Sequence, residues 1–264
     1  MRKIGINTRA TRRELSDERY IELISELGFD SAFSDVNFGR TDLYNISNLL
    51  AKKGIAHEYL HSDFSHINDM WLDNYRGESM FALLRDNIDC TAEMNIPISI
   101  IHLSSGNNPP SISDIGRKRY AELVDYAAKK NVTIAFENLR KLANVAWAFE
   151  AFADAENVGF CWDCGHENCY TPTIEFMPLF GKKLISTHIH DNRGIKDGDD
   201  HVLPFDGSLN FDRFAEHMRN ADYDGTLMLE VFRTEEFYSN VTAEEFIIKA
   251  AEKVKKLRAM IDGE

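Results

Sequence analysis

Eight short apolar runs, each followed by a longer amphipathic stretch, most constrain what this chain can fold into. Short apolar runs bounded by turn signals indicate buried strands, and apolar residues at helical spacing indicate helices packed on one face. The expected strands are Lys3–Asn7, Ser31–Asp35, Ile55–Leu60, Ile98–Leu103, Val132–Glu137, Val158–Asp163, Leu184–His190 and Thr226–Val231. A strand–helix unit that recurs about every 33 residues predicts a parallel sheet.

Helical patterns fill the intervals between these strands and follow the last one. They are Glu18–Leu27, Leu43–Lys52, Ser79–Met94, Ile115–Lys130, Val145–Ala155, Phe211–Ala221 and Ala243–Ile261. Helix-stopping residues precede three strands: Gly28, Gly54 and Pro97. No Gly-x-Gly-x-x-Gly follows the first strand, which weakens a dinucleotide-binding fold. Eight units in 264 residues therefore predict an α/β fold, a single (β/α)8 TIM barrel spanning residues 1–264.

Composition narrows the partners that we expect. The formal net charge of −13 disfavours nucleic acid, because an acidic surface repels phosphate backbones. No apolar run approaches the length of a membrane span, which needs about 18 residues, and the N-terminal residues lead directly into a strand. We therefore expect a cytoplasmic enzyme with no membrane partner and a small-molecule substrate. Whether the chain forms a homo-oligomer stays open.

Ligand-type side chains stand at the carboxyl ends of six consecutive expected strands. In a parallel barrel these ends converge on one mouth, where the longest loops also lie. The six are His61, His102, Glu137, Asp163, His188 and Glu230, and His166, His190, Asp199 and His201 lie on the same strands or in the loops after them.

The segment from Cys161 to His201 is especially dense in such groups, with four histidines and at least four carboxylates. Imidazole and carboxylate together form the ligand set of a borderline divalent cation such as zinc or manganese. A solvated charged face would instead be rich in Lys and Glu. Glu137 and Glu230 follow apolar strands, where an unpaired charge is costly to bury. A cation shared by Glu137, Asp163 and Glu230 would resolve this cost, so we expect a metal site.

Several residues also have ordinary structural interpretations. Cys161-x-x-Cys164 could form a structural zinc site, but the two side chains are expected to point in different directions from a strand and its end. His57 is expected to be a satisfied core histidine or to face a helix. His66 is expected on a surface loop, with a role in a pocket as the alternative. Phe64 and Trp71 could cover a sugar's apolar face or simply pack.

Five motifs in strand order carry a resemblance to a known family. They are Ala135-Phe-Glu137-Asn138, Asp163-Cys-Gly-His166, His188-Ile-His-Asp191, Asp199-Asp-His201 and Leu229-Glu230. In this order they resemble the xylose isomerase-like barrel superfamily, which includes sugar and sugar-phosphate isomerases and epimerases, inosose dehydratase-like enzymes and endonuclease IV. The resemblance spans essentially the whole chain. After His201 this chain has Pro204-Phe205-Asp206-Gly207 where the family often has a Gly-x-Gly turn.

The resemblance implies a set of metal ligands and roles. In the family's ketose epimerases, one divalent ion is held by residues that match Glu137, Asp163, His188 and Glu230, and the two glutamates move a proton on opposite faces of the substrate carbon. The endonuclease branch binds three zinc ions, and its extra positions match His61, His102, His166, Asp199 and His201. Candidate substrate-binding residues are His166, His190 and Arg193, and Asn138 and Asp191 are candidates for orienting ligands.

These expectations favour a divalent-metal-dependent isomerase or epimerase of a small sugar, sugar phosphate or polyol. The cofactor would be Zn²⁺ or Mn²⁺, with Mg²⁺ or Co²⁺ as further candidates. Proton transfer alpha to a metal-bound carbonyl would use Glu137 and Glu230 as catalytic base and acid, in an order that the sequence leaves open.

Two rival functions remain. An endonuclease IV-like hydrolase of abasic DNA would use the enlarged ligand set, but the acidic charge and the lack of an evident basic groove argue against it. A non-catalytic sugar-binding barrel predicts an incomplete ligand set, and no ligand is visibly missing.

Overall fold

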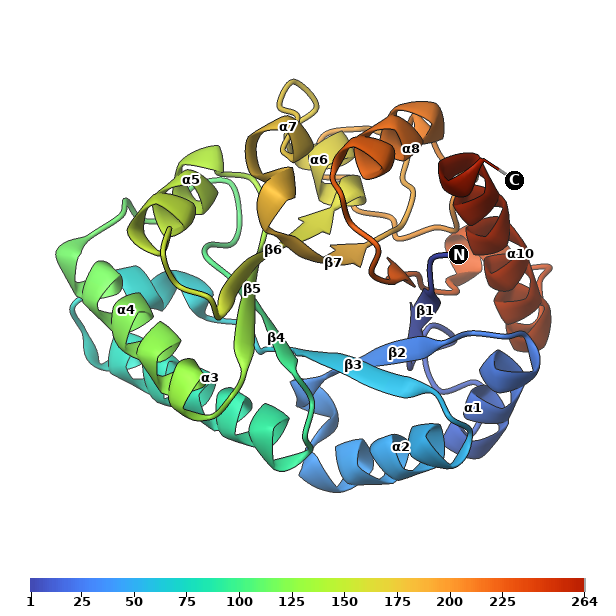
Figure 1. Cartoon of the computed structure of the whole chain (residues 1–264), viewed down its shortest axis with the longest axis horizontal. Coiled ribbons are helices and arrows are strands. Elements are labelled where there is room, and N and C mark those ends of the chain that lie inside the picture. Colours follow the sequence, from blue (N-terminus) through green and yellow to red (C-terminus); the bar gives the residue numbers. More distant parts are fainter. Residues whose placement is uncertain (264) are drawn as a thin grey trace.

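In the computed structural model, which describes residues 1–263, eight parallel strands form one sheet that curves into a barrel (Figure 1). The strands are β1 Ile4–Asn7, β2 Ser31–Asp35, β3 Ala56–His61, β4 Ile98–His102, β5 Thr133–Glu137, β6 Val158–Asp163, β7 Leu184–His188 and β8 Leu227–Leu229. Neighbours in sequence are neighbours in the sheet, and β1 also pairs with β8. A parallel bridge between Ile189 and Leu229, just beyond β7, joins the two remaining edges. The predicted (β/α)8 barrel is confirmed.

Helices surround the strands and connect each to the next (Figure 1). The longer ones are α1 Asp17–Glu26, α2 Arg40–Lys52, α3 Tyr75–Glu93, α4 Asp114–Lys129, α5 Leu142–Ala151, α8 Phe211–Asn220 and α10 Ala243–Asp262. The shorter ones are α6 Cys164–Tyr170, α7 Met177–Phe180, α9 Glu235–Tyr238 and the 3-10 turns η1 Val36–Phe38, η2 Ile67–Trp71 and η3 Gly181–Lys183. All seven predicted helices are present. The shorter elements were not predicted, because so few residues show no helical period.

The local signals act as expected at the helix ends. Gly28 and Gly54 adopt left-handed backbone angles, with φ of 76° and 72°, directly after α1 and α2. A residue without a Cβ carries little penalty in this conformation, so the chain can leave each helix and enter the next strand. Polar side chains accept backbone N–H groups at several helix starts, and Thr242 and Glu245 form a capping box on α10.

Successive side chains of each strand point to opposite faces of the sheet, so the apolar side chains form two layers. One layer lies between the strands and the helices. The other is a small cluster to which six strands each contribute one residue, and we infer that it fills the barrel interior. Its members are Phe33, Tyr59, Ile100, Ala135, Cys161 and Met228. Because strand side chains repeat every two residues, the residue two positions after each member also points inward. Those six residues are Asp35, His61, His102, Glu137, Asp163 and Glu230.

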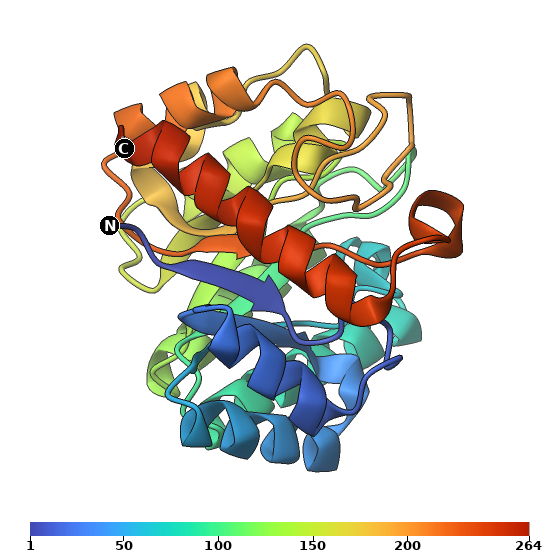
Figure 2. The same cartoon turned by 90° about the vertical axis from the view of Figure 1, so that its right-hand side faces the viewer.

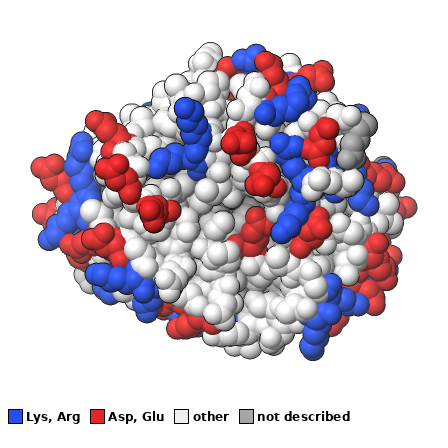
Figure 3. All heavy atoms as spheres, in the orientation of Figure 1, with Lys and Arg blue, Asp and Glu red and all other residues white. Residues whose placement is uncertain are grey.

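The carboxyl ends of the strands therefore carry a ring of polar side chains above an apolar plug. In Figure 2, β1 runs from the N-terminus at the left towards the right, so the carboxyl ends of the parallel strands face right. The face shown in Figure 3 carries acidic and basic side chains interspersed with one another. No helix within the described residues is long and apolar enough to cross a membrane.

The surroundings of Trp71, His57 and His66 decide between the alternatives that the sequence left for these three residues. Trp71 is buried and donates its indole N–H to the Leu103 carbonyl oxygen at 2.7 Å, so it is a packing residue. His57 faces α2, where its Nδ1 lies 2.6 Å from Ser47 Oγ, and the side chain of His66 is 73% exposed.

His57 should make stability depend on pH. Burial lowers its pKa to about 4, from an ordinary value of 6.5. The unfolded chain therefore binds a proton that the folded chain excludes, and stability falls as pH drops below 6.5 towards 4. Between pH 7.5 and 5.0 we expect a loss of about 1–2 kcal/mol from this residue. Urea denaturation of His57→Gln at both pH values should show a smaller pH dependence than the unchanged protein. Equal pH dependence in the two proteins would contradict this assignment.

Candidate metal centre

Ligand-type side chains at the barrel mouth form three groups that could each hold a cation. The first contains His61, His102 and Glu137, and the second contains Glu137, Asp163, His188 and Glu230. The third contains His166, His190, Asp199 and His201. Within each group, the potential ligand atoms all lie within 4.8 Å of one another. Cys161 forms a further combination with Glu137 and His188. Glu137 is common to the first and second groups, which makes it the central carboxylate of the mouth.

The first group gathers at one oxygen of Glu137. His61 Nε2 lies 3.3 Å and His102 Nε2 lies 3.0 Å from Glu137 Oε2, and the two ring nitrogens are 3.2 Å apart. All three side chains are almost completely buried. These contacts come from β3, β4 and β5, which are consecutive strands of the barrel. Their shared position follows from the inward alternation of those strands.

The second group uses the other oxygen of Glu137. His188 Nδ1 lies 3.3 Å from Glu137 Oε1 and 3.3 Å from Glu230 Oε2. The same nitrogen is 4.0 Å from Asp163 Oδ2. Glu230 is the most accessible member, with 12% of its side chain exposed, whereas Glu137 is 1% exposed. The two glutamates therefore converge on His188 from β5 and from the end of β8.

The third group is built around Asp199, which lies in the long loop after β7. His166 Nε2 and His201 Nε2 each lie 3.3 Å from Asp199 Oδ2. Tyr170 donates its hydroxyl to the same oxygen at 2.9 Å. His190 stacks on His201 at a centroid distance of 3.9 Å, and its Nε2 lies 3.1 Å from Asp163 Oδ1. The third group is thus linked through Asp163 to the second.

Neighbouring histidines and carboxylates in these groups shift one another's pKa values towards the charged forms. Burial raises the pKa of Glu137, but His188 and His102 outweigh it, and the net pKa lies well below the ordinary value. Burial likewise opposes a lowered pKa at Asp163, where His166 and His190 prevail. Burial lowers the pKa of His201, but Asp199 raises it to about 9. Glu137 and Asp163 therefore stay ionised, as ligands of a cation must be.

Several buried atoms here fit a divalent cation. Within residues 1–263, Glu137 Oε1 and the two ring nitrogens of His188 make no hydrogen bond of normal geometry, although Glu137 Oε1 lies 3.1 Å from His166 Nδ1 and 3.3 Å from His188 Nδ1. An unsatisfied buried polar atom costs about 1–3 kcal/mol, so folded proteins seldom leave several together. A cation bound by Glu137 Oε1 and one ring nitrogen of His188 would satisfy these two atoms, and a mixed imidazole–carboxylate set suits zinc or manganese. The residues of the second group therefore fit the ion that the sequence predicts.

Neighbouring residues hold the ligands in place. Asn138 exchanges two hydrogen bonds with the backbone of Asp163, both at 2.8 Å, which fixes the end of β6. Gly165 leaves room for His190, because a Cβ at position 165 would lie 2.0 Å from His190 Cε1. Asp191, expected to orient a ligand, instead accepts the backbone N–H groups of Asn192, Gly207 and Leu209. Asp191 therefore shapes the loop after His201.

The ligand groups open into a cavity of about 300 Å³. Its lining comprises His61, Phe64, His102, Ser105, Gly106, Glu137, Leu139, Arg140, His166, Tyr170, Asp199, His201 and Glu230. Of the predicted substrate-binding residues, the structure brings His166 into this lining. Arg193 is not part of the lining, and its guanidinium pairs with Asp200 at 2.7 Å and with Glu236 at 3.2 Å. His190 is fully buried behind Asp163 and is also outside the lining.

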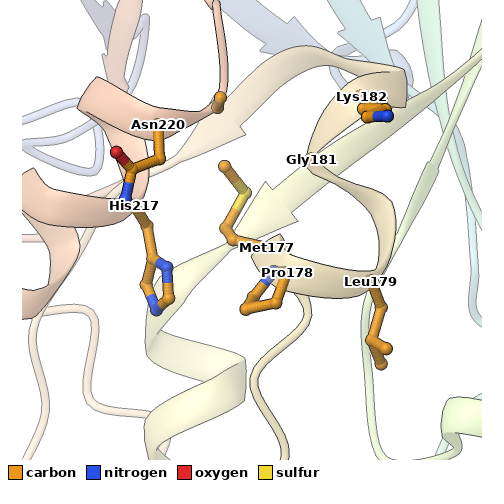
Figure 4. Close-up of a pocket in the computed structure, with 8 residues that line it drawn as sticks. Met177, Pro178, Leu179, Gly181, Lys182, His217 and Asn220 are labelled. Carbon is orange, nitrogen blue, oxygen red and sulfur yellow. The ribbon is translucent and has the colours of Figure 1, made fainter.

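A larger hollow of about 490 Å³ lies elsewhere, between α7 and α8. Figure 4 shows His217 and Asn220 on one side of it and Met177 and Pro178 on the other. It shares no residue with the three ligand groups among the residues described. It therefore gives no reason to move the candidate site away from the mouth.

Sequence reasoning missed four side chains near the mouth. Asp35 ends β2 with the same inward alternation as the ligands, so the strand-end pattern could have found it. Burial raises the pKa of Asp35 above its ordinary value. Cys161 lies on β6 two residues before Asp163, and its sequence pattern suggested only a shared zinc site with Cys164. Arg140 and Tyr170 lie in or next to loops, and nothing in their spacing indicated the cavity.

Comparisons with known proteins place this architecture in a family. An uncharacterized protein, y4fM, from Sinorhizobium fredii is 30% identical over 171 residues, which cover 60% of this chain and 54% of that protein. An inosose isomerase from Bacillus velezensis is 30% identical over 142 residues, covering 50% of each chain. The matched segments thus span about half of each relative's own length.

Solved structures share the whole fold. The crystal structure of D-psicose 3-epimerase with D-tagatose from Clostridium cellulolyticum H10 superposes with a TM-score of 0.79 and 15% identity, covering 98% of this chain and 99% of that one. The 3-keto-D-glucoside 4-epimerase YcjR from E. coli gives 0.73 and 18%, covering 98% and 100%. At these identities the likeness shows the fold alone. The family described as xylose isomerase-like TIM barrel matches residues 21–259. The chain therefore belongs to the xylose isomerase-like TIM barrel family.

Proposed function

We propose that this protein is a divalent-metal-dependent isomerase or epimerase of a small sugar, sugar phosphate or polyol. One observation carries the proposal: Glu137 and Glu230 belong to one ligand group with Asp163 and His188, and both glutamates line the cavity. A pair of carboxylates beside a cation is what proton removal and return at a carbon next to a carbonyl requires.

Glu137, Asp163, His188 and Glu230 would hold the ion. When bound, the ion would act as a Lewis acid that draws electron density from the substrate carbonyl and makes the adjacent C–H more acidic. Asn138 would keep Asp163 in register through its two backbone hydrogen bonds. Orienting residues of this kind commonly account for a 10–100-fold effect on metal affinity or activity.

The two glutamates would perform the proton transfer. One carboxylate would take the proton from the carbon next to the carbonyl, and the other would deliver a proton to the same carbon or its neighbour. Positioned general bases contribute about 10²–10⁴-fold to such steps. His166 lines the cavity beside Asp199 and would donate a hydrogen bond to a substrate hydroxyl. The ring of Phe64, 40% exposed at the mouth, would cover an apolar face of the substrate.

The relatives support a carbohydrate substrate. Their names include an inosose isomerase, a D-psicose 3-epimerase and a 3-keto-D-glucoside 4-epimerase, all isomerases or epimerases. The cavity volume of about 300 Å³ is at the small end of ligand pockets, which fits a small sugar or polyol.

Deuterium exchange tests this function directly. We expect the Mn²⁺- or Zn²⁺-loaded protein to introduce solvent deuterium into at least one ketose or inosose during turnover in D₂O, because proton transfer through a carboxylate exchanges with solvent. NMR of a panel of ketoses and inososes would locate the labelled carbon. Glu150→Gln, on the exposed face of α5, serves as the matched control and should exchange normally. No turnover and no exchange with the whole panel would contradict the proposal.

A second function is favoured by one specific observation. The three ligand groups are contiguous, and Glu137 belongs to two of them. A site with several adjacent cations is suited to phosphodiester hydrolysis, in which metal ions stabilise attacking and leaving oxygens. Metal analysis per chain and incubation with an abasic-site DNA duplex separate the two candidates. Two or three ions with robust incision would favour hydrolysis, and one ion with sugar turnover would favour isomerisation.

A further inference from the structure

One cationic side chain lines the candidate cavity together with the two proposed catalytic glutamates. Arg140, in the short loop between β5 and α5, is the only Lys or Arg among the described residues that line the cavity. Its side chain is 18% exposed, so it is largely enclosed by its neighbours. It follows Glu137 by three residues, in the loop that leaves the carboxyl end of β5.

One stacking contact fixes the plane of its guanidinium. The Arg140 Cζ atom lies 3.5 Å from the centre of the Tyr170 ring, in a stacked cation–π contact. Tyr170 itself is held by its hydroxyl bond to Asp199 and by stacking on His166, with ring centres 4.9 Å apart. The orientation of Arg140 is therefore tied to the third ligand group.

A salt bridge fixes the remaining freedom of the side chain. Arg140 Nε donates to Asp197 Oδ1 at 3.1 Å, and Asn107 Nδ2 donates to Asp197 Oδ2 at 3.2 Å. Asp197 thereby joins the loops that follow β4, β5 and β7 above the cavity. A guanidinium held at Nε and on one face keeps its two terminal nitrogens for another partner. No acceptor within residues 1–263 meets Arg140 Nη1 or Nη2.

This arrangement has a specific chemical use. The two terminal nitrogens of a guanidinium match a pair of oxyanion oxygens, and such bidentate pairs are stronger and more directional than single hydrogen bonds. Pre-orientation by Tyr170 and Asp197 lowers the entropy lost when an anion binds. We propose that Arg140 is a specificity-determining residue that binds an anionic substituent of the substrate, a phosphomonoester or a carboxylate, while the reacting carbon lies towards Glu137 and Glu230. This inference rests on the proposed sugar isomerase function.

Binding measurements with the metal-loaded protein test the inference without requiring turnover. Three hexose probes of similar shape, D-glucose 6-phosphate, D-glucuronate and D-glucose, would be titrated calorimetrically. We expect at least one anionic probe to bind about 10–100-fold more tightly than D-glucose. Arg140→Gln should abolish that preference, and Arg140→Lys should retain only part of it, since an ammonium group lacks the fork. Arg213→Gln is the matched control and should keep the preference. It removes an exposed arginine of α8 that is paired with Glu175.

The outcomes distinguish a phosphate from a carboxylate substituent. They also distinguish failure of the Arg140 inference from failure of the proposed isomerase function. Tighter binding of the phosphate probe would indicate a sugar phosphate substrate, and tighter binding of the uronate would indicate a sugar acid. An unchanged preference in Arg140→Gln would overturn the inference, because the anion would then be held by groups other than Arg140. Binding of D-glucose as tight as that of both anions, or binding of neither anion, would overturn it as well. Failure of the underlying function would appear instead as absent deuterium exchange across the sugar panel.

Discussion

Glu137→Gln is expected to lower the metal content of the purified protein and to reduce kcat/KM by about 10³-fold, whichever sugar is turned over. The amide preserves the size of the side chain but removes the charge that Glu137 contributes to two ligand groups. Its neutral nitrogen would also face His61, His102 or His188, each of which now contacts a carboxylate oxygen. Elemental analysis per chain and steady-state kinetics at saturating metal would measure both effects.

The control for this substitution is a glutamate of equal size outside the mouth. Glu150→Gln, on the exposed face of α5, should leave metal content and kinetics unchanged. Circular dichroism would establish that both variants fold. If Glu137→Gln retained a full complement of metal and a kcat/KM within about twofold of the unchanged protein, neither the ligand role nor the catalytic role could stand.

Removing divalent ions with a chelator is expected to abolish turnover and to lower the thermal midpoint by about 5–15 °C. A ligand present at 100–1,000 times its dissociation constant stabilises the native state by about 3–4 kcal/mol, and each kcal/mol shifts the midpoint of a chain of this size by about 2–4 °C. Glu137 and His188, each with a buried atom that makes no normal hydrogen bond among the described residues, are ligands that would lose the bound cation. Differential scanning calorimetry before chelation, after it and after re-addition of Zn²⁺ or Mn²⁺ would follow the change.

Two comparisons make the chelation experiment decisive. The midpoint of Glu137→Gln should respond much less to the chelator, because that variant binds little metal from the outset. Re-addition of the correct ion should restore both the midpoint and the turnover of the unchanged protein. A protein that stays active, with the same midpoint, after its metal content falls below detection would show that the site does not depend on a cation.

Most of the fold could be predicted because barrel strands buried on both faces read as short apolar runs. β2 and β6 have the predicted bounds, and the other strands differ by one or two residues at their ends. The helix α6 was missed because Asp163 is at once the last strand residue and the N-cap, accepting the His166 backbone N–H at 2.6 Å. A residue with two roles leaves no loop between the elements, so the sequence shows no boundary.

The residues of the candidate site were also predicted only in part. Members of the second ligand group were expected from motif order, and the structure gathers Glu137, Asp163, His188 and Glu230 within reach of one cation. Arg193 was expected at the substrate and is engaged with Asp200 instead. Arg140, which does line the cavity, gave no signal in the sequence. Arg140 is oriented by Tyr170 and Asp197, which lie in other segments of the chain, and spacing within its own loop does not encode those partners.

The sequence by itself determined the eight-stranded barrel and the ring of ligand-type residues at its mouth. Both follow from local periodicity: alternation makes each strand end point inward, and parallel pairing brings those ends to one face. The tertiary structure alone decided how the ring divides into three groups and that Glu137 is shared between two of them. It also decided which arginine faces the cavity. Register between strands and the paths of long loops depend on packing across the barrel, and no local pattern records that packing.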